Sequence, residues 1–336
     1  MASIRSSHRS KHTRILTKED LKIVFLGTPE FAVESLDRLV KGGYNIVGVI
    51  TMPDKPAGRG HKMLHSPIKE YALAHNLHLM QPANLKDEEF LKELHSLDAD
   101  LFIVIAFRML PKAVWQMPRL GTFNLHASLL PLYRGAAPIN WAVINGDTRT
   151  GVTTFFLKHE IDTGDILRQE SIDILPDDDC GTVHDKLMML GADLTIDTVE
   201  HIIAGDLQPI PQEKLLTGIE PTPAPKIFKD TCRINWNDKA ENIHNLVRGL
   251  SPYPAAWTEL YDNGEIVNIL KIFKTEVISE GCHALTPGKV TIANGEMTVD
   301  AADARIRILS LQPQGKKRMD TSDYLRGARL SNPSML

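Results

Sequence analysis

The sequence predicts an α/β protein with a mostly parallel sheet, followed by a small OB-like β-barrel. Three observations lead to this fold class. A buried strand, an amphipathic helix and a second strand follow one another within residues 21–51. Five prolines crowd residues 206–225, and short strands separated by Gly-containing turns fill the chain after them.

The first strand, Leu21–Gly27, ends in a glycine, and Pro29 and Glu30 open a helix that runs to about Val40. Residues 44–51 form the next strand, which gives a βαβ unit and hence a parallel sheet. Further helices are predicted at 66–75 and 87–97, and further strands at 77–80, 100–107 and 121–128. The run 100–107 is the most apolar and is predicted to be central.

Beyond Pro138, a helix is predicted at 139–145, a strand at 151–157 with a hairpin partner at 166–174, and a long helix at 181–203. We expect four parts: a disordered extension (1–20), an α/β catalytic domain (21–205), a Pro-rich linker (206–225) and a C-terminal domain (226–336). In the last, one helix (240–250) precedes strands at 256–260, 267–273, 288–293, 297–300 and 306–312.

Composition limits the class of protein. The 336 residues are 43% hydrophobic and 24% charged, with a net charge of −4, as is ordinary for a globular protein. Cys180, Cys232 and Cys282 lie far apart and predict neither a disulfide framework nor a metal site. No apolar run could span a bilayer. We expect a cytoplasmic monomer without metal or membrane attachment; a transit peptide is the alternative interpretation of the basic N-terminus.

Asn124 and His126 end an apolar strand two residues apart, so they point to the same side. Ligands bind beyond the carboxyl ends of strands in an open parallel sheet, which favours a cleft position over simple packing. Asp162, in Asp162-Thr163-Gly164, supplies a carboxylate, although a plain turn explains this tripeptide equally well. An amide, an imidazole and a carboxylate can polarise a carbonyl and move a proton.

Two basic segments could each either form a solvated surface or contact phosphate groups. Lys55, Arg59 and Lys62 alternate with Pro and Gly in the loop after the second strand. Lys316, Lys317 and Arg318 form a cluster near the C-terminus that could contact a nucleic-acid backbone. The turn Gly27-Thr28-Pro29 lacks the GxGxxG pattern, which argues against a dinucleotide site.

These segments together resemble the methionyl-tRNA formyltransferase family over the chain after residue 20. The matching motifs are Phe25–Pro29, Pro53–Gly60, Asn124–Pro131, Arg134–Ile139, Asp162–Asp165 and Gly315–Met319. The resemblance implies a Rossmann-like formyltransferase domain, a linker and an OB-like domain that helps to hold tRNA. It implies 10-formyltetrahydrofolate as formyl donor and initiator methionyl-tRNA as acceptor.

The resemblance also implies roles for residues. Asn124, His126 and Asp162 match the catalytic positions, and Ser128, Leu129, Leu130 and Pro131 match the folate-binding turn. Arg59 matches the loop arginine that contacts the tRNA acceptor end. We expect Asn124 and a protonated His126 to donate to the developing formyl oxygen, and Asp162 to orient His126 and collect the amine proton.

Arg108 departs from the family pattern, where a small or uncharged residue is usual; we expect it either to point outward or to meet the glutamate tail of the folate. Two alternatives remain. A formyltransferase for a small amine, such as a glycinamide ribonucleotide or a nucleotide sugar, would share the three catalytic residues but need no tRNA domain. A catalytically idle RNA-binding protein would not need those residues.

Overall fold

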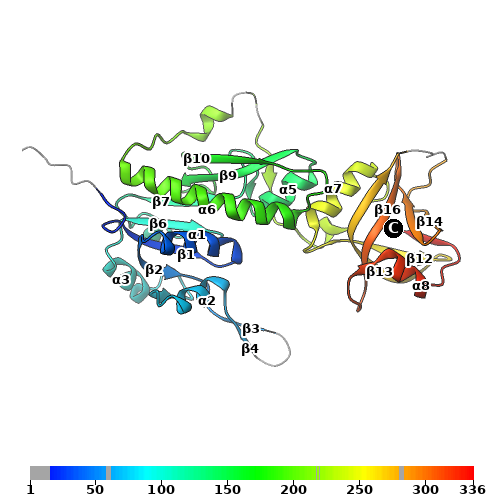
Figure 1. Ribbon diagram of the computed structural model, residues 1–336, viewed down its shortest axis with the longest axis horizontal. Coiled ribbons are helices and arrows are strands. Elements are labelled where there is room, and N and C mark those ends of the chain that lie inside the picture. The colour runs from blue at the N-terminus through cyan, green and yellow to red at the C-terminus, as the bar shows by residue number, and fades with distance from the viewer. Residues whose placement is uncertain (1–15, 58–61, 217, 219, 280–283) are drawn as a thin grey trace, which may run out of the picture. The chain divides into compact units, whose positions relative to one another are not determined.

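The computed structural model describes residues 16–57, 62–216, 218, 220–279 and 284–336 (Figure 1). Its contacts separate the chain into two units. Unit 1 consists of Met1–Thr122 and Thr195–Gln208, and unit 2 consists of Phe123–Leu194 and Pro209–Leu336.

Parallel strands form the sheet of unit 1. Strand β1 pairs in parallel with β2 and with β6, and β2 pairs in parallel with β5. The strands are β1 (Lys22–Gly27), β2 (Asn45–Ile50), β5 (Leu79–Met80) and β6 (Leu101–Ile105). The helices are α1 (Glu30–Lys41), α2 (Pro67–Ala74), α3 (Glu88–Ser96) and α4 (Lys112–Trp115). All of β6 is buried, as in a strand covered on both faces. The predicted Rossmann-like, mostly parallel sheet is confirmed.

Helix α1 shows how the sequence builds this layer. Its buried side chains recur with helical spacing and are Phe31, Ala32, Ser35, Leu36 and Leu39. The turn before it is tight, since a Cβ on Gly27 would lie 2.8 Å from the Cβ of Ala32. Helices α2 and α3 begin at side-chain caps, where Ser66 accepts from the Lys69 N–H and Asp87 from the Phe90 N–H.

Unit 2 begins with an antiparallel group of strands. Strand β9 (Arg149–Phe156) pairs antiparallel with both β7 (Thr122–His126) and β10 (Ile166–Asp173), which confirms the predicted hairpin (Figure 1). Helix α5 (Pro138–Ile144) precedes β9, and α6 (Cys180–Ala204) follows β10. A Cβ on Gly191 of α6 would lie 2.7 Å from Cδ2 of Leu125 on β7, so α6 packs against that face of the strand.

The Pro-rich segment is hydrogen-bonded to the β7–β10 part of unit 2 at several points. Ile210 exchanges two backbone hydrogen bonds of 2.8 Å with Ile166. A 3-10 helix, η1 (Gln212–Leu215), follows, and β11 (Pro223–Ala224) pairs in parallel with β8 (Arg134–Gly135). The extended segment that was expected along a surface is thus anchored near both of its ends.

The C-terminal part of unit 2 is an antiparallel barrel-like sheet with strand order β14-β15-β16-β13-β12-β18. A bridge between Lys289 and Ser334, with a 2.7 Å bond from Met335 N to Gly288 O, nearly closes it. The elements are η2 (Asp230–Cys232), α7 (Ala240–Leu250), β12 (Ala256–Asp262), β13 (Glu265–Ile278), β14 (Val290–Ala293), β15 (Glu296–Asp300), β16 (Arg305–Pro313), β17 (Met319–Asp320), α8 (Thr321–Gly327) and β18 (Pro333–Met335). The OB-like barrel is confirmed; β17, α8 and β18 were not predicted.

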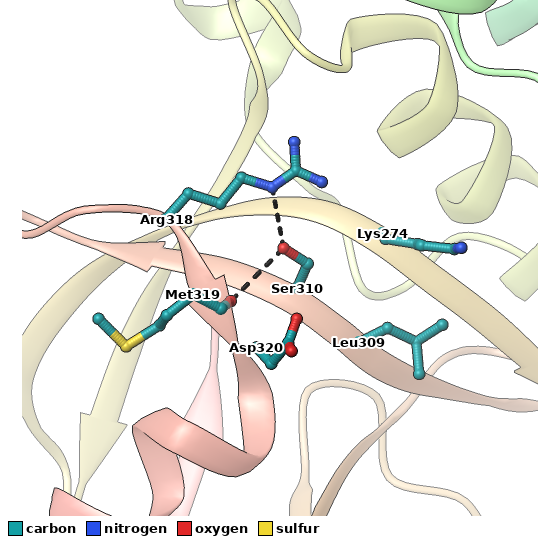
Figure 2. A pocket seen from close by; sticks show the side chains of 6 residues that line it. All are labelled: Lys274, Leu309, Ser310, Arg318, Met319 and Asp320. Carbon is teal, nitrogen blue, oxygen red and sulfur yellow. Dashed lines mark hydrogen bonds between the residues drawn. The ribbon is translucent and has the colours of Figure 1, made fainter.

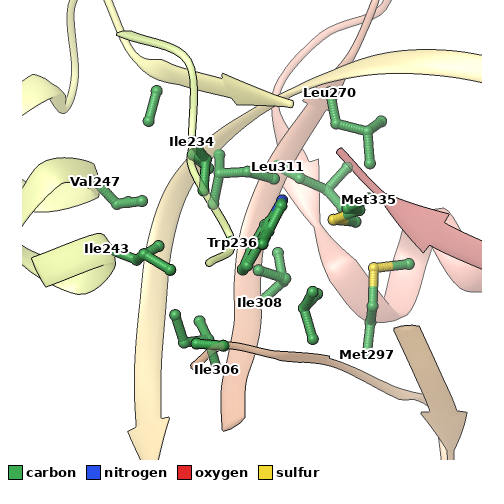
Figure 3. Packing of buried hydrophobic residues seen from close by; sticks show 14 of the residues in the cluster. Ile234, Trp236, Ile243, Val247, Leu270, Met297, Ile306, Ile308, Leu311 and Met335 are labelled. Atoms are coloured by element: carbon green, nitrogen blue, oxygen red, sulfur yellow. The ribbon is translucent and has the colours of Figure 1, made fainter. Parts of the chain in front are cut away.

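Trp236 lies in the barrel's hydrophobic core (Figure 3). It packs among Ile308, Met297 and Met335, each at most 1% exposed, and its indole N–H donates to Thr258 Oγ1 at 3.0 Å. A buried tryptophan needs such a partner for its polar edge.

Unit 1 also contains a short antiparallel hairpin, formed by β3 (Lys55–Ala57) and β4 (Lys62–Leu64).

No helix within the described residues is long and apolar enough to cross a membrane.

Candidate active site

Strand β7 carries Asn124 and His126 on one face. Phe123 and Leu125, which alternate with them, are buried on the other, where Leu125 meets α6. His126 is paired across the ladder with Thr153 of β9 and is 7% exposed. The two-residue spacing in the sequence therefore correctly predicted that Asn124 and His126 lie on the same face of the strand.

The imidazole of His126 is held by a backbone group. Its Nε2 atom lies 2.9 Å from the carbonyl oxygen of Tyr133, and its ring meets Phe155 edge-on with the centroids 6.4 Å apart. A carbonyl oxygen can only accept, so Nε2 carries the hydrogen. Nδ1 is then the ring nitrogen left to react.

Asp162 lies beside that nitrogen. Its Oδ2 atom is 4.0 Å from Nδ1 of His126 and accepts a 3.0 Å hydrogen bond from the Gly135 N–H. The structure thus brings the expected carboxylate and imidazole together, at a separation longer than a hydrogen bond. The Tyr133 carbonyl, which contacts the other ring nitrogen, is a second group that fixes the orientation of the imidazole, and it was not expected from the sequence. Sequence reasoning missed this because a backbone acceptor has no residue-type signal.

The Asn124 side chain has unused hydrogen-bonding capacity. Its Oδ1 atom is buried and has no hydrogen-bond partner among the described residues. Buried polar atoms nearly always have a partner, so an unpartnered one on the same strand face as His126 indicates a place for a ligand.

The turn expected to bind folate is held by its own hydrogen bonds. Ser128 Oγ donates to the Leu132 carbonyl at 2.7 Å, and Thr153 Oγ1 both donates to the Ser128 carbonyl and accepts from the Leu130 N–H. Gln169 donates to the Leu130 carbonyl at 2.7 Å. The turn is therefore rigid, and its Leu129 side chain is partly exposed, whereas Leu130 and Pro131 are buried.

Both parts of the chain match known protein families. A family model described as "Formyl transferase" matches residues 21–199, and one described as "Formyl transferase, C-terminal domain" matches residues 226–329. The methionyl-tRNA formyltransferase of Bacteroides fragilis is 59% identical over 318 residues, which are 94% of this chain and 98% of that protein. That of Flavobacterium johnsoniae is 52% identical over 314 residues, with coverages of 94% and 98%.

The chain belongs to the methionyl-tRNA formyltransferase family. The resemblance of the sequence motifs is thereby confirmed.

Solved structures agree on the fold. The N-formyltransferase from Helicobacter canadensis, in complex with folinic acid and dTDP-3-aminofucose, superposes with a TM-score of 0.65 at 20% identity and covers 87% of this chain and 99% of that one. HypX from Aquifex aeolicus, in complex with tetrahydrofolic acid, gives 0.62 at 17% identity and covers 93% of this chain and 48% of that one. At these identities the likeness concerns the fold alone.

The basic loop of this formyltransferase family member belongs to unit 1. Lys55 is exposed on β3, and Lys62 lies on β4. Arg59 lies outside the described residues. The base of the loop is fixed because Asp54 accepts from Lys69 at 2.5 Å and from Gln81 at 3.0 Å. These hydrogen bonds, with Lys69 first, lower the pKa of the Asp54 carboxyl.

The C-terminal basic cluster divides into two kinds of side chain. Lys316 and Lys317 are exposed in the turn between β16 and β17. Arg318 is exposed as well, but its guanidinium lies over the Phe273 ring at 4.5 Å. Its Nε donates to Ser310 Oγ at 2.9 Å (Figure 2). A hollow of about 550 Å³ is lined by Arg318 together with Lys274, Leu309, Ser310, Met319 and Asp320. The cluster therefore has two exposed lysines beside one arginine that is held by Phe273 and Ser310.

Arg108 is engaged within unit 1. Its guanidinium donates to the backbone carbonyls of Pro82 and, at 3.0 Å, Ala83, and burial lowers the pKa of the group. These bonds join the segment after β6 to the loop after β5. That use was not among those expected from the sequence.

Proposed function

We propose that this protein transfers the formyl group of 10-formyltetrahydrofolate to the free amino group of initiator methionyl-tRNA, giving formylmethionyl-tRNA for translation initiation. The observation that carries the proposal is the 59% identity to a methionyl-tRNA formyltransferase across 94% of the chain. The 59% identity to a methionyl-tRNA formyltransferase, against 20% to the Helicobacter canadensis enzyme solved with an amino-sugar nucleotide, supports the tRNA acceptor over a small amine. Folate derivatives in two proteins of the same fold support the donor.

The side chains on β7 suit the charge that develops in such a transfer. Attack of the amine on the formyl carbon places negative charge on the formyl oxygen. The Asn124 amide and Nδ1–H of a doubly protonated His126 would donate to that oxygen, while Tyr133 holds the ring through Nε2. The Asp162 carboxylate lies 4.0 Å from Nδ1, and its negative charge would stabilise the positive charge of such a ring.

The proton shed by the attacking amine needs an acceptor. Asp162 would take it, directly or through a water, because it is the carboxylate beside the imidazole. The Gly135 N–H bond keeps the carboxylate in place while it does so. Collapse of the tetrahedral adduct would then break the bond between the formyl carbon and N10 of the folate, and the same proton would pass to N10 as tetrahydrofolate leaves. Asp162 thus acts as a base rather than as the group that selects the imidazole tautomer.

Different segments of the chain would bind the folate and the tRNA. The Ser128–Pro131 turn would contact the folate through shape and apolar surface, since its hydroxyl is already bonded. Lys55, Arg59 and Lys62 would contact the acceptor end of the tRNA. Lys316, Lys317 and Arg318 would contact its backbone. We further propose that the protein acts as a monomer in the cytoplasm, where initiator tRNA is used.

The test is formyl transfer from labelled 10-formyltetrahydrofolate, with initiator methionyl-tRNA, a glycinamide ribonucleotide and an amino sugar nucleotide as rival acceptors. We expect transfer to the tRNA alone. Asp162→Asn should lower kcat with little change in the KM for tRNA, and Arg59→Ala should raise that KM with little change in kcat. Transfer to a small amine, or tRNA binding without transfer from the donor, would each refute the proposal.

A further inference from the structure

One buried glutamine in the Pro-rich segment touches the backbone of the Asp162 turn. Gln212 opens η1 and is 0% exposed, whereas the next residues, Glu213, Lys214 and Leu215, are exposed. Its amide Nε2 donates to the carbonyl of Asp162 at 2.9 Å and to that of Gly164 at 2.8 Å. One side chain therefore bridges both ends of the tripeptide that carries the carboxylate.

Arg134 fixes the orientation of that amide. Its Nε and Nη2 atoms donate to Gln212 Oε1 at 3.1 and 2.7 Å. A guanidinium only donates, so Oε1 must face it and Nε2 must face the two carbonyls. The amide thus has each of its polar atoms engaged, and no other uncharged side chain of this length offers both an acceptor and two donors.

The far end of the segment reaches the same carboxylate. Ala224 pairs with Gly135, whose N–H donates to Asp162 Oδ2 at 3.0 Å. The pairing is close: a Cβ on Gly135 would lie 2.4 Å from the Ala224 carbonyl oxygen. Gln212 therefore holds the backbone of the Asp162 turn, and Ala224 pairs with Gly135, which holds the carboxylate.

We propose that Gln212 is a positioning residue for formyl transfer, which acts by holding the Asp162 turn so that its carboxylate stays beside His126. This inference rests on the proposed function. Asp162 has a φ of +54°, a backbone conformation that residues other than Gly, Asn and Asp rarely adopt. The two hydrogen bonds from Gln212 stabilise that conformation. Without them the carboxylate shifts, and a displacement of about 1 Å costs roughly 10²-fold in rate.

A double-mutant cycle tests the inference with methionyl-tRNA and 10-formyltetrahydrofolate. The variants are Gln212→Ala, Gln212→Glu, Asp162→Asn and the two double variants, with Gln208→Glu as control because Gln208 is an exposed glutamine of the same segment. Gln212→Glu has the same size and can still accept from Arg134, but it cannot donate to the carbonyls. Urea unfolding of each variant shows whether it is folded.

We expect Gln212→Ala and Gln212→Glu each to lower kcat by roughly 10²-fold, with both KM values changed less than about twofold. Gln208→Glu should match the wild type. In the Asp162→Asn background, the Gln212 substitutions should have little further effect, because they act through Asp162.

Two outcomes overturn the inference while leaving the proposed function intact. One is wild-type kcat in folded Gln212→Glu protein. The other is an equal loss from the Gln212 substitutions with and without Asp162→Asn, which would mark a general structural effect. A wild-type protein that transfers no formyl group to methionyl-tRNA would overturn the proposed function, and the inference with it.

Discussion

The Nε2 atom of His126 lies 2.9 Å from the carbonyl oxygen of Tyr133. This contact decides which tautomer the neutral ring adopts, since the carbonyl accepts only from an N–H. We predict that long-range ¹H–¹⁵N correlation spectra of the neutral form show hydrogen on Nε2 and a bare Nδ1. A ring with its hydrogen on Nδ1 would contradict the assignment of Nδ1 as the reacting nitrogen.

Asn124 gives a second prediction. Asn124→Asp keeps the size of the side chain but replaces the amide donor with an acceptor, so it should lower kcat by roughly 10²–10³-fold, the usual loss for one donor to a developing oxyanion. Asn124→Ala should lose a similar factor. Steady-state kinetics with methionyl-tRNA measure both, and a kcat within threefold of wild type would remove Asn124 from the mechanism.

The C-terminal cluster predicts how salt weakens tRNA binding. Lys316→Ala and Lys317→Ala should each reduce the slope of log K against log salt by about 1, with little effect on stability, because both side chains are exposed. Arg318→Ala should also lower the urea midpoint, since Arg318 packs on Phe273 and bonds to Ser310. Lys86→Ala, at an exposed site of unit 1, is the control. Unchanged slopes would exclude the cluster from the tRNA surface.

His244 predicts a pH dependence of stability. Burial lowers the pKa of its imidazole below the ordinary value of 6.5, and Arg248 acts in the same direction, while Nδ1 lies 2.9 Å from Thr275 Oγ1. The unfolded chain then binds a proton more readily than the folded one, so the stabilisation present above pH 6.5 is lost as the pH falls through the folded pKa.

Urea unfolding between about pH 7.5 and 5 measures this effect. The wild-type midpoint should fall more steeply with acid than that of His244→Asn, whose amide does not titrate. Parallel curves for the two proteins would show that His244 carries no part of the acid sensitivity.

Much of this arrangement could be predicted because it depends on local pattern. The two-residue spacing of Asn124 and His126 determines their common face in any strand, and the apolar run 101–105 gives a buried strand wherever it sits in a sheet. The Asp162 tripeptide has the composition of a turn with positive φ, and the structure gives Asp162 a φ of +54°.

The remaining contacts could not be predicted, because they join side chains to backbone groups far away in the sequence. Gln212 contacts the Asp162 carbonyl across 50 positions, and a carbonyl has no residue type. The partners of Arg108 are likewise two carbonyls, 25 and 26 positions away. Strand β18 was not predicted because its three residues gain their extended conformation from pairing with β12.

The left-handed backbone at Asp162 has a consequence for how this site can vary. Asp and Asn tolerate that conformation, whereas longer side chains rarely adopt it. At Gly164, two residues on, a Cβ would lie 1.5 Å from the Phe156 carbonyl oxygen, so the turn cannot easily relax around a new residue. Replacement by Asn keeps the backbone but loses the negative charge, and replacement by Glu keeps the charge but strains the backbone. Neither of these replacements therefore keeps both the negative charge and the backbone conformation of Asp162.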